Sequence, residues 1–211
     1  MKKIMNDPSN VVSEMVAGLV SAYPTYLTQL PETTAVVRAD RASMQGKVGL
    51  VSGGGSGHEP AHAGFVGDGM LSAAVCGQVF TSPTPDQIYE AIKASDTGAG
   101  VFLIIKNYSG DVMNFEMAKD MAELDDIKVS SIVVDDDIAV ENSLYTQGKR
   151  GVAGTVLMHK ILGAAADQGA NLAEIEALAK EVMPHLKTLG VALSAATVPE
   201  VGKPGFELAD D

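Results

Sequence analysis

The stretch KVGLVSGGGSGHEP, at residues 47–60, joins a short apolar run to three consecutive glycines, a further glycine and His58. An apolar run of this length that ends in glycine is typical of a buried strand. The bare backbone after it exposes amide groups that favour an oxygen-rich ligand. A tight turn explains one or two glycines, but it does not explain four with a histidine attached. The stretch therefore predicts a ligand loop at the end of a strand.

Strand-like and helix-like segments alternate on both sides of this loop. The expected strands are residues 34–39, 47–52, 71–76, 100–107 and 127–134. The expected helices are residues 7–23, 84–95, 111–125, 150–167 and 171–186. Alternation of this kind predicts an α/β fold in which helices sandwich a mostly parallel sheet.

The C-terminal residues do not fit that alternation. The run GVALSAAT, residues 190–197, has the pattern of another strand, and a stretch rich in proline and glycine follows it. A strand after two successive helices needs a sheet to join. We therefore expect an N-terminal α/β domain at residues 1–187, and at residues 188–211 the start of a second, truncated α/β domain.

Composition excludes several classes of partner. The formal net charge is −12 and no lysine or arginine cluster offsets it, which argues against nucleic acid and against an anionic membrane surface. The apolar run at residues 100–105 is too short to cross a bilayer. No secretory signal pattern opens the sequence, and its only cysteine, Cys76, is interpreted as a buried filler of the core; we expect a cytoplasmic protein.

Lys106 and Asp111 stand where the most apolar strand is expected to end. Ligands of open α/β sheets bind beyond the carboxyl ends of strands, so both side chains are candidates for a site. Lys106 can hold an oxygen or be a solvated strand end. Asp111 can act as a general base or as the N-cap of the next helix.

Other polar residues suggest a metal less well. Asp135–Asp137 could bind Mg²⁺, but adjacent carboxylates at a strand end favour capping or a solvated role. His62 follows His58 by four residues, yet no third ligand has suitable spacing, so no metal site is predicted. His159 and His185 lie within expected helices and are interpreted as structural.

Five segments together carry a family resemblance. They are residues 46–88, 103–118, 133–140, 143–157 and 196–206. With them the chain resembles the substrate-binding subunits of dihydroxyacetone (glycerone) kinases, DhaK of the phosphotransferase-dependent type, or the equivalent region of the ATP-dependent single-chain enzymes. The resemblance covers essentially the whole chain and implies phosphoryl transfer to a hydroxyl of dihydroxyacetone.

The resemblance also implies a set of site residues. The substrate-binding positions are Gly55, Ser56, Gly57, His58, Lys106 and Asp111. By the same resemblance His58 hydrogen-bonds the ketose and assists proton transfer, and Asp111 accepts or orients the proton of the attacking hydroxyl. These two are the expected catalytic residues.

Cofactor and partners follow from the resemblance as well. The glycine loop matches no P-loop, because His58 and Glu59 stand where lysine and serine or threonine are required. The resemblance implies that ATP or ADP and Mg²⁺ bind to a separate DhaL-like subunit or domain, and that the chain forms a homodimer. A histidine beyond Asp211 would bind the ketone covalently, so this chain should hold dihydroxyacetone reversibly and be inactive alone.

A second interpretation of the resemblance remains open. Some relatives of these subunits are transcriptional coactivators that sense dihydroxyacetone without phosphorylating it. A sensor needs no proton acceptor, so Asp111 favours the kinase.

Overall fold

The computed structural model describes residues 4–141, 143 and 146–208. Its centre is a six-stranded sheet in the order β1-β2-β4-β3-β5-β6. The strands are β1 (Leu27–Gln29), β2 (Ala35–Arg38), β3 (Gly49–Ser56), β4 (Ala73–Val79), β5 (Val101–Lys106) and β6 (Val129–Val134). The four strands from β4 to β6 are parallel, whereas β1 and β2 pair antiparallel at one edge. The mostly parallel sheet is confirmed.

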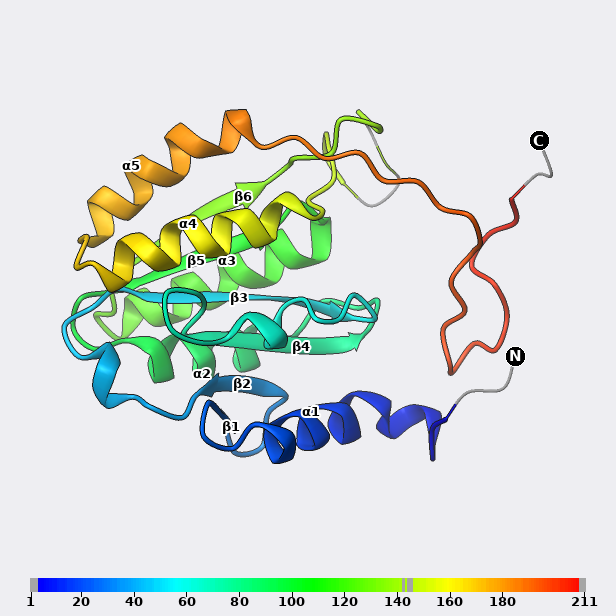
Figure 1. Cartoon of the computed structure of the whole chain (residues 1–211), viewed down its shortest axis with the longest axis horizontal. Coiled ribbons are helices and arrows are strands. Elements are labelled where there is room, and N and C mark those ends of the chain that lie inside the picture. The colour runs from blue at the N-terminus through cyan, green and yellow to red at the C-terminus, as the bar shows by residue number, and fades with distance from the viewer. Residues whose placement is uncertain (1–3, 142, 144–145, 209–211) are drawn as a thin grey trace.

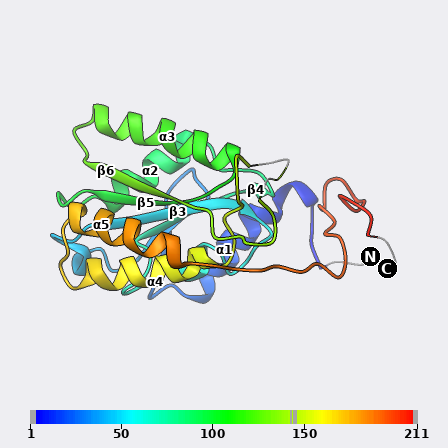
Figure 2. The ribbon, with the colours of Figure 1, turned by 90° about the horizontal axis from the view of Figure 1, so that it is seen from above.

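Helices cover both faces of the sheet. They are α1 (Val11–Ala22), α2 (Pro85–Ser95), α3 (Ser109–Leu124), α4 (Gly154–Asp167) and α5 (Leu172–Val182). Figure 2 shows α2 and α3 on one face, and α1, α4 and α5 on the other. The expected α/β sandwich is therefore present (Figure 1).

Strand β5 shows why the central strands are apolar throughout. Phe102 and Ile104 belong to the core beneath α4 and α5, whereas Leu103 and Ile105 belong to the core beneath α2 and α3. Successive side chains of a strand point to opposite faces, and both faces are covered here. The continuous apolar run is thus the pattern of a strand buried on both sides.

The strand order creates a crevice at one end of the sheet. From β3 the chain continues to β4 on one side, while β5 pairs with β3 on the other side. The connections that leave the carboxyl ends of β3 and β5 therefore diverge, and such a topological switch point is where open α/β sheets bind ligands.

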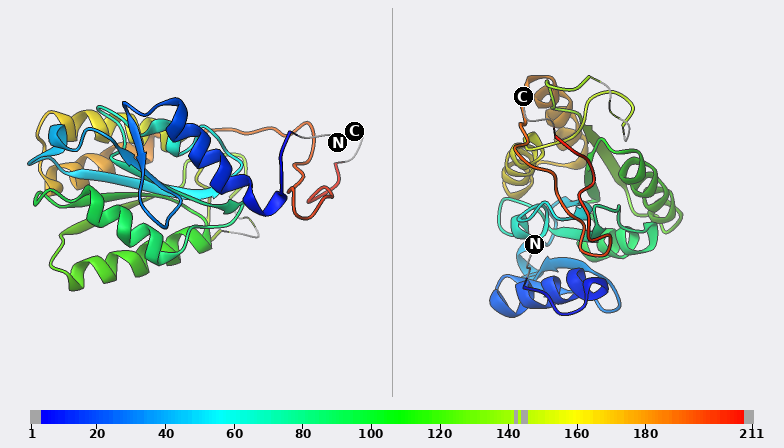
Figure 3. Two further views of the ribbon diagram at one scale, coloured as in Figure 1. Left: turned by 90° about the horizontal axis from the view of Figure 1, so that it is seen from below. Right: turned by 90° about the vertical axis from the view of Figure 1, so that its right-hand side faces the viewer.

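The strand expected at residues 190–197 is not formed. Among the described residues this segment has one isolated bridge, between Thr197 and Pro204, and Val191 and Leu193 are 82% and 94% exposed. Figures 1 and 3 show the segment after α5 leaving the body as an extended coil. No described strand lies beside it to pair its backbone, so its apolar pattern alone does not make a strand. The domain division at residue 187 stays a prediction.

None of the described helices combines the length and the apolar character that crossing a membrane requires.

Candidate functional site

The three consecutive glycines belong to β3 and not to a loop, which corrects the expectation from the sequence. A Cβ on Gly53 would lie 2.6 Å from the carbonyl oxygen of Val75, and one on Gly55 would lie 2.5 Å from the nitrogen of Thr81. A Cβ on Gly54 would instead lie 3.5 Å from Nε2 of His62. Two glycines thus permit close packing against β4 and the segment after it, while Gly54 lies toward a polar cavity.

This cavity has a volume of about 770 Å³ and lies at the switch point between β3 and β5. Its walls come from β3, the segment after β3, the β4–α2 connection, the end of β5 and the start of α3. They include Gly54, Gly55, His58, His62, Phe80, Thr81, Ser82, Lys106, Tyr108, Ser109, Gly110, Asp111 and Asn114. The site therefore combines segments from residues 54–114.

Asp111 lies in the first turn of α3 and is not its N-cap, because Tyr108 holds that position. The side chain is buried, and its Oδ1 atom has no hydrogen-bond partner among the described residues. Burial raises the pKa of Asp111 from 3.8 to about 6, although a hydrogen bond with Ser82 and the charge of Lys106 both oppose the rise. A carboxylate with this pKa can accept a proton near neutral pH.

Lys106 and His58 line the same cavity. Burial lowers the pKa of Lys106, and the charges of Asp111 and Asp136 partly restore it. Desolvation and then the charge of Lys106 lower the pKa of His58, so its imidazole is neutral at neutral pH. The His58 ring lies 5.2 Å from the Phe80 ring, between centroids. The cavity thus offers a cation, a neutral imidazole and a carboxylate to one small ligand.

Ser56 and Gly57 do not line this cavity. The hydroxyl of Ser56 is buried and donates to the carbonyl oxygen of Gly77 at 2.7 Å. Gly57 adopts a φ of +110°, and a Cβ there would lie 2.5 Å from the Phe80 ring. Of the site residues expected from the resemblance, the structure brings together Gly55, His58, Lys106 and Asp111 around the cavity. The Ser56 side chain instead hydrogen-bonds the backbone of the neighbouring strand β4.

Sequence reasoning missed Gly54 and set His62 aside as a poor metal ligand. His62 is 6% exposed and its Nδ1 lies 3.0 Å from Nε2 of His159 on α4. The described part of the chain contains no group of three or more possible metal ligands around them. Neither the face of β3 to which Gly54 belongs nor the histidine pairing had a signal in the sequence.

Asp136 and Asp137 are buried and hold the segment before α4 by hydrogen bonds, so of the two roles favoured from the sequence, capping or solvated, the solvated one is wrong. Asp136 is buried and accepts hydrogen bonds from the amides of Val152 and Gly154 at 2.8 and 2.7 Å. Asp137 accepts one from Nε of Arg150 at 2.7 Å. Their contacts therefore fix the segment before α4, which carries part of the wall of an adjoining cavity of about 360 Å³.

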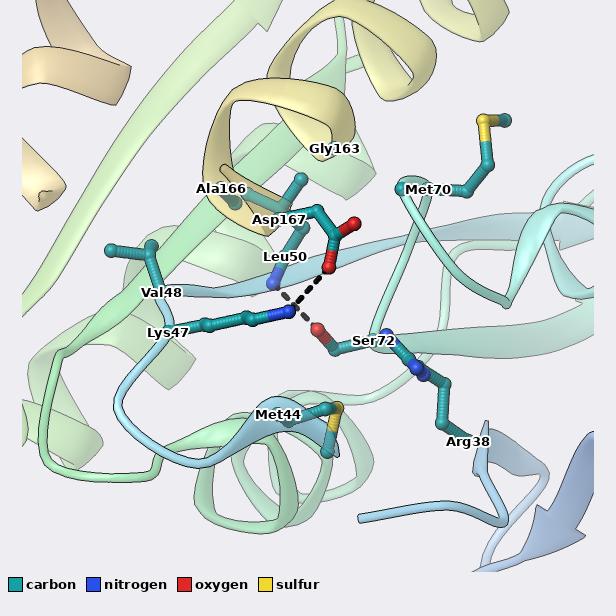
Figure 4. Close-up of a pocket in the computed structure, with 11 residues that line it drawn as sticks. Arg38, Met44, Lys47, Val48, Leu50, Met70, Ser72, Gly163, Ala166 and Asp167 are labelled. Carbon is teal, nitrogen blue, oxygen red and sulfur yellow. Dashed lines mark hydrogen bonds and ion pairs between the residues drawn. The ribbon is translucent and has the colours of Figure 1, made fainter. Parts of the chain in front are cut away.

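A further small cavity lies at the opposite, amino-terminal end of β3 and β4 (Figure 4). Its two cations are already paired, Arg38 with Asp68 and Lys47 with Asp167. Its volume of about 20 Å³ suits little more than one water molecule. We therefore assign no ligand to it.

The chain matches a family model described as the Dak1 domain over residues 17–211. It is 69% identical over 210 residues to the dihydroxyacetone-binding subunit DhaK of the PTS-dependent dihydroxyacetone kinase from Lactococcus lactis, covering 100% of this chain and 63% of that protein. It is 67% identical to the dihydroxyacetone-binding subunit DhaK of PTS-dependent dihydroxyacetone kinase 1 from Listeria innocua, covering 100% of this chain and 64% of that protein. The chain therefore spans less than two thirds of the length of these relatives.

Two solved structures have folds similar to that of this chain. The dihydroxyacetone kinase of C. freundii, in its native form, superposes with a TM-score of 0.79 at 41% identity, over 86% of this chain and 33% of that one. The dihydroxyacetone kinase operon co-activator Dha-DhaQ superposes with a TM-score of 0.86 at 46% identity, over 94% of this chain and 60% of that one.

Proposed function

Since this chain belongs to the Dak1 domain family, we propose that it binds dihydroxyacetone and holds one hydroxyl of the ketose for phosphoryl transfer from a separate subunit. The observation that carries the proposal is Asp111, a buried carboxylate in the cavity at the switch point. Its Oδ1 has no hydrogen-bond partner within the described part of the chain, and its pKa is raised to about 6. A proton acceptor of this kind is needed for transfer to a hydroxyl but not for binding alone.

The cavity residues have separate roles in this proposal. The hydroxyl oxygen of the ketose attacks the phosphorus of the donor's transferred phosphoryl group and gives its proton to Asp111. The bond from that phosphorus to the donor's leaving group breaks, and the leaving group stays on the separate subunit. Lys106 holds a ligand oxygen, His58 hydrogen-bonds the ketose from the side, and the bare backbone at Gly54 and Gly55 allows the ligand to approach. Phosphoryl transfer depends mainly on positioning and electrostatics, which a cavity of fixed polar groups supplies.

The phosphoryl donor belongs elsewhere in this proposal. Lys106 is the only lysine or arginine among the described residues that line the main cavity, so the cavity fits a triphosphate and its Mg²⁺ poorly. We assign the nucleotide to a DhaL-like subunit, as the family resemblance implies. The same resemblance supports a homodimer, the division into domains at residue 187 and a cytoplasmic setting, with the single cysteine in agreement.

Calorimetric titration tests the binding step on this chain. Dihydroxyacetone should bind with a stoichiometry of one, while glycerol, which has hydroxyls but no carbonyl, should bind more weakly. Asp86 is exposed in the first turn of α2 and does not line the cavity, so Asp86→Asn is the matched control for the loss of an aspartate and should bind like the unmodified chain. Equal affinity for both ligands, or no binding of either, contradicts the proposal.

Phosphoryl transfer is tested in a chimaera, because the chain spans about 63% of the Lactococcus lactis subunit. The chain replaces the matching region of that subunit, and the partner subunit and phosphoryl donor are added. Asp111→Asn should lower the rate by about 10²–10⁴-fold with little change in affinity. A chimaera that binds dihydroxyacetone but transfers no phosphoryl group would favour the coactivator function.

A further inference from the structure

His62 lines the cavity and forms a buried pair with His159 of α4. His62 and His159 are 6% and 0% exposed, and Nδ1 of His62 lies 3.0 Å from Nε2 of His159. The same Nδ1 lies 3.3 Å from the hydroxyl oxygen of Ser52, which itself donates to the carbonyl oxygen of Ile104 at 2.6 Å. Both of these contacts of His62 use Nδ1, which leaves Nε2 for another partner.

Both imidazoles are neutral at neutral pH. Burial lowers the pKa of His62 well below its ordinary value, and the charge of Lys106 lowers it further. Burial, and then the charge of Lys106, lowers the pKa of His159 to about 3. A neutral imidazole carries one proton, so each ring has one donor nitrogen and one acceptor nitrogen.

The surroundings of His159 decide which nitrogens carry the protons. Its Nδ1 is buried and has no hydrogen-bond partner among the described residues. A buried N–H without an acceptor is rarer and more costly than a lone pair without a donor. The proton of His159 therefore belongs on Nε2, from which it donates to Nδ1 of His62. The 3.3 Å contact with Ser52 is too long to outweigh this preference.

It follows that His62 carries its own proton on Nε2, and this atom lies beside the cavity. A Cβ built on Gly54 would be 3.5 Å from Nε2 of His62 and 3.6 Å from Oδ2 of Asp111. The donor of His62 and the carboxylate of Asp111 thus lie around the same bare position of β3. The two groups offer a ligand one hydrogen-bond donor and one acceptor.

We propose that His62 is a further ligand-contacting residue, which donates its Nε2–H to an oxygen of the bound hydroxyketone, and that His159 is a positioning residue that fixes this tautomer. The inference rests on the proposed function for the identity of the ligand. A ligand hydroxyl that gives its proton to Asp111 keeps lone pairs for His62, and a ketone oxygen has lone pairs only. His62 therefore favours a ligand that has an oxygen atom facing Nε2. Because its ring is neutral, it adds no second charge beside Lys106.

The tautomers are tested on the ligand-free chain by ¹⁵N NMR of the imidazole nitrogens. The expected spectrum shows both rings protonated at Nε2 and bare at Nδ1. His159→Gln, whose amide nitrogen reaches the position of Nε2, should preserve the tautomer of His62, while His159→Leu should leave His62 a mixture of both. Protonation of His159 at Nδ1 in the unmodified chain overturns the inference without reference to any ligand.

The ligand contact is tested by calorimetry with dihydroxyacetone. His62→Gln keeps an N–H donor near the position of Nε2 and should bind within roughly threefold of the unmodified chain, whereas His62→Asn loses that donor and should bind about tenfold more weakly. Equal affinities of the two variants overturn the contact. An unmodified chain that does not bind dihydroxyacetone contradicts the proposed function instead. The NMR spectrum of the unmodified chain decides the tautomer in that case, and also if His62→Asn fails to fold.

Discussion

Replacing Asp111 by asparagine should stabilise the protein at pH 8 and have little effect near pH 4. Burial raises the pKa of the carboxyl group from 3.8 to about 6 in the folded state. A group whose pKa is raised on folding contributes stability that is complete below its unfolded pKa and is lost as the pH rises through the folded pKa. Above pH 6 the folded protein must therefore hold a poorly solvated carboxylate, which asparagine removes.

The size of the effect follows from the shift. A rise from 3.8 to about 6 is roughly two pKa units, which corresponds to about 3 kcal/mol in the free energy of unfolding. Each kcal/mol moves the melting temperature by about 2–4 °C in a chain of this size. The favourable interactions with Ser82 and Lys106 are already contained in the net shift.

Urea denaturation at pH 4, 6 and 8, followed by circular dichroism, measures the difference. Asp86→Asn is the matched control, because Asp86 lies in the first turn of α2 but is exposed. Its removal should cost about 0.3–1 kcal/mol at pH 8, since an exposed carboxylate at a helix N-terminus is favourable. If Asp111→Asn is no more stable than the unmodified protein at pH 8, or keeps the same advantage at pH 4, burial does not control this carboxyl group.

Other substitutions separate the roles of neighbouring residues. Gly54→Ala places its Cβ at ordinary contact distance in the cavity and should weaken dihydroxyacetone binding by roughly tenfold or more in calorimetry while the fold survives. Gly55→Ala places its Cβ 2.5 Å from a backbone nitrogen and should destabilise the fold by about 1–3 kcal/mol in urea. Asp136→Ala should destabilise by about 3–5 kcal/mol, because buried amides lose their acceptor, whereas exposed Asp135→Ala should stay within about 0.5 kcal/mol. Lys106→Met removes a positive charge that lowers the pKa of Asp111. The pKa of Asp111 should therefore rise, and the acidic limb of the pH–rate profile of the chimaera should move upward from about pH 6.

The sequence by itself determined the layers of the fold and the end of the sheet at which polar groups gather. Local patterns carry this information: a continuous apolar run such as residues 100–105 is typical of a strand covered on both faces, and a polar residue after such a run lies at its carboxyl end. For this reason the amino-acid pattern alone places Lys106 and Asp111 beside the glycine stretch. The strand expected at residues 190–197 shows the limit of the same reasoning, because a pattern cannot supply a neighbouring strand.

Only the tertiary structure decided what each candidate can do. The face of β3 to which a residue belongs depends on its pairing with β4, which turns Gly54 to the cavity and commits the hydroxyl of Ser56 to Gly77. The pKa of Asp111 depends on the packing around it. His62 and His159, 97 residues apart, meet because α4 packs against the sheet. Burial and hydrogen-bond partners are properties of distant contacts, and one-dimensional patterns do not contain them.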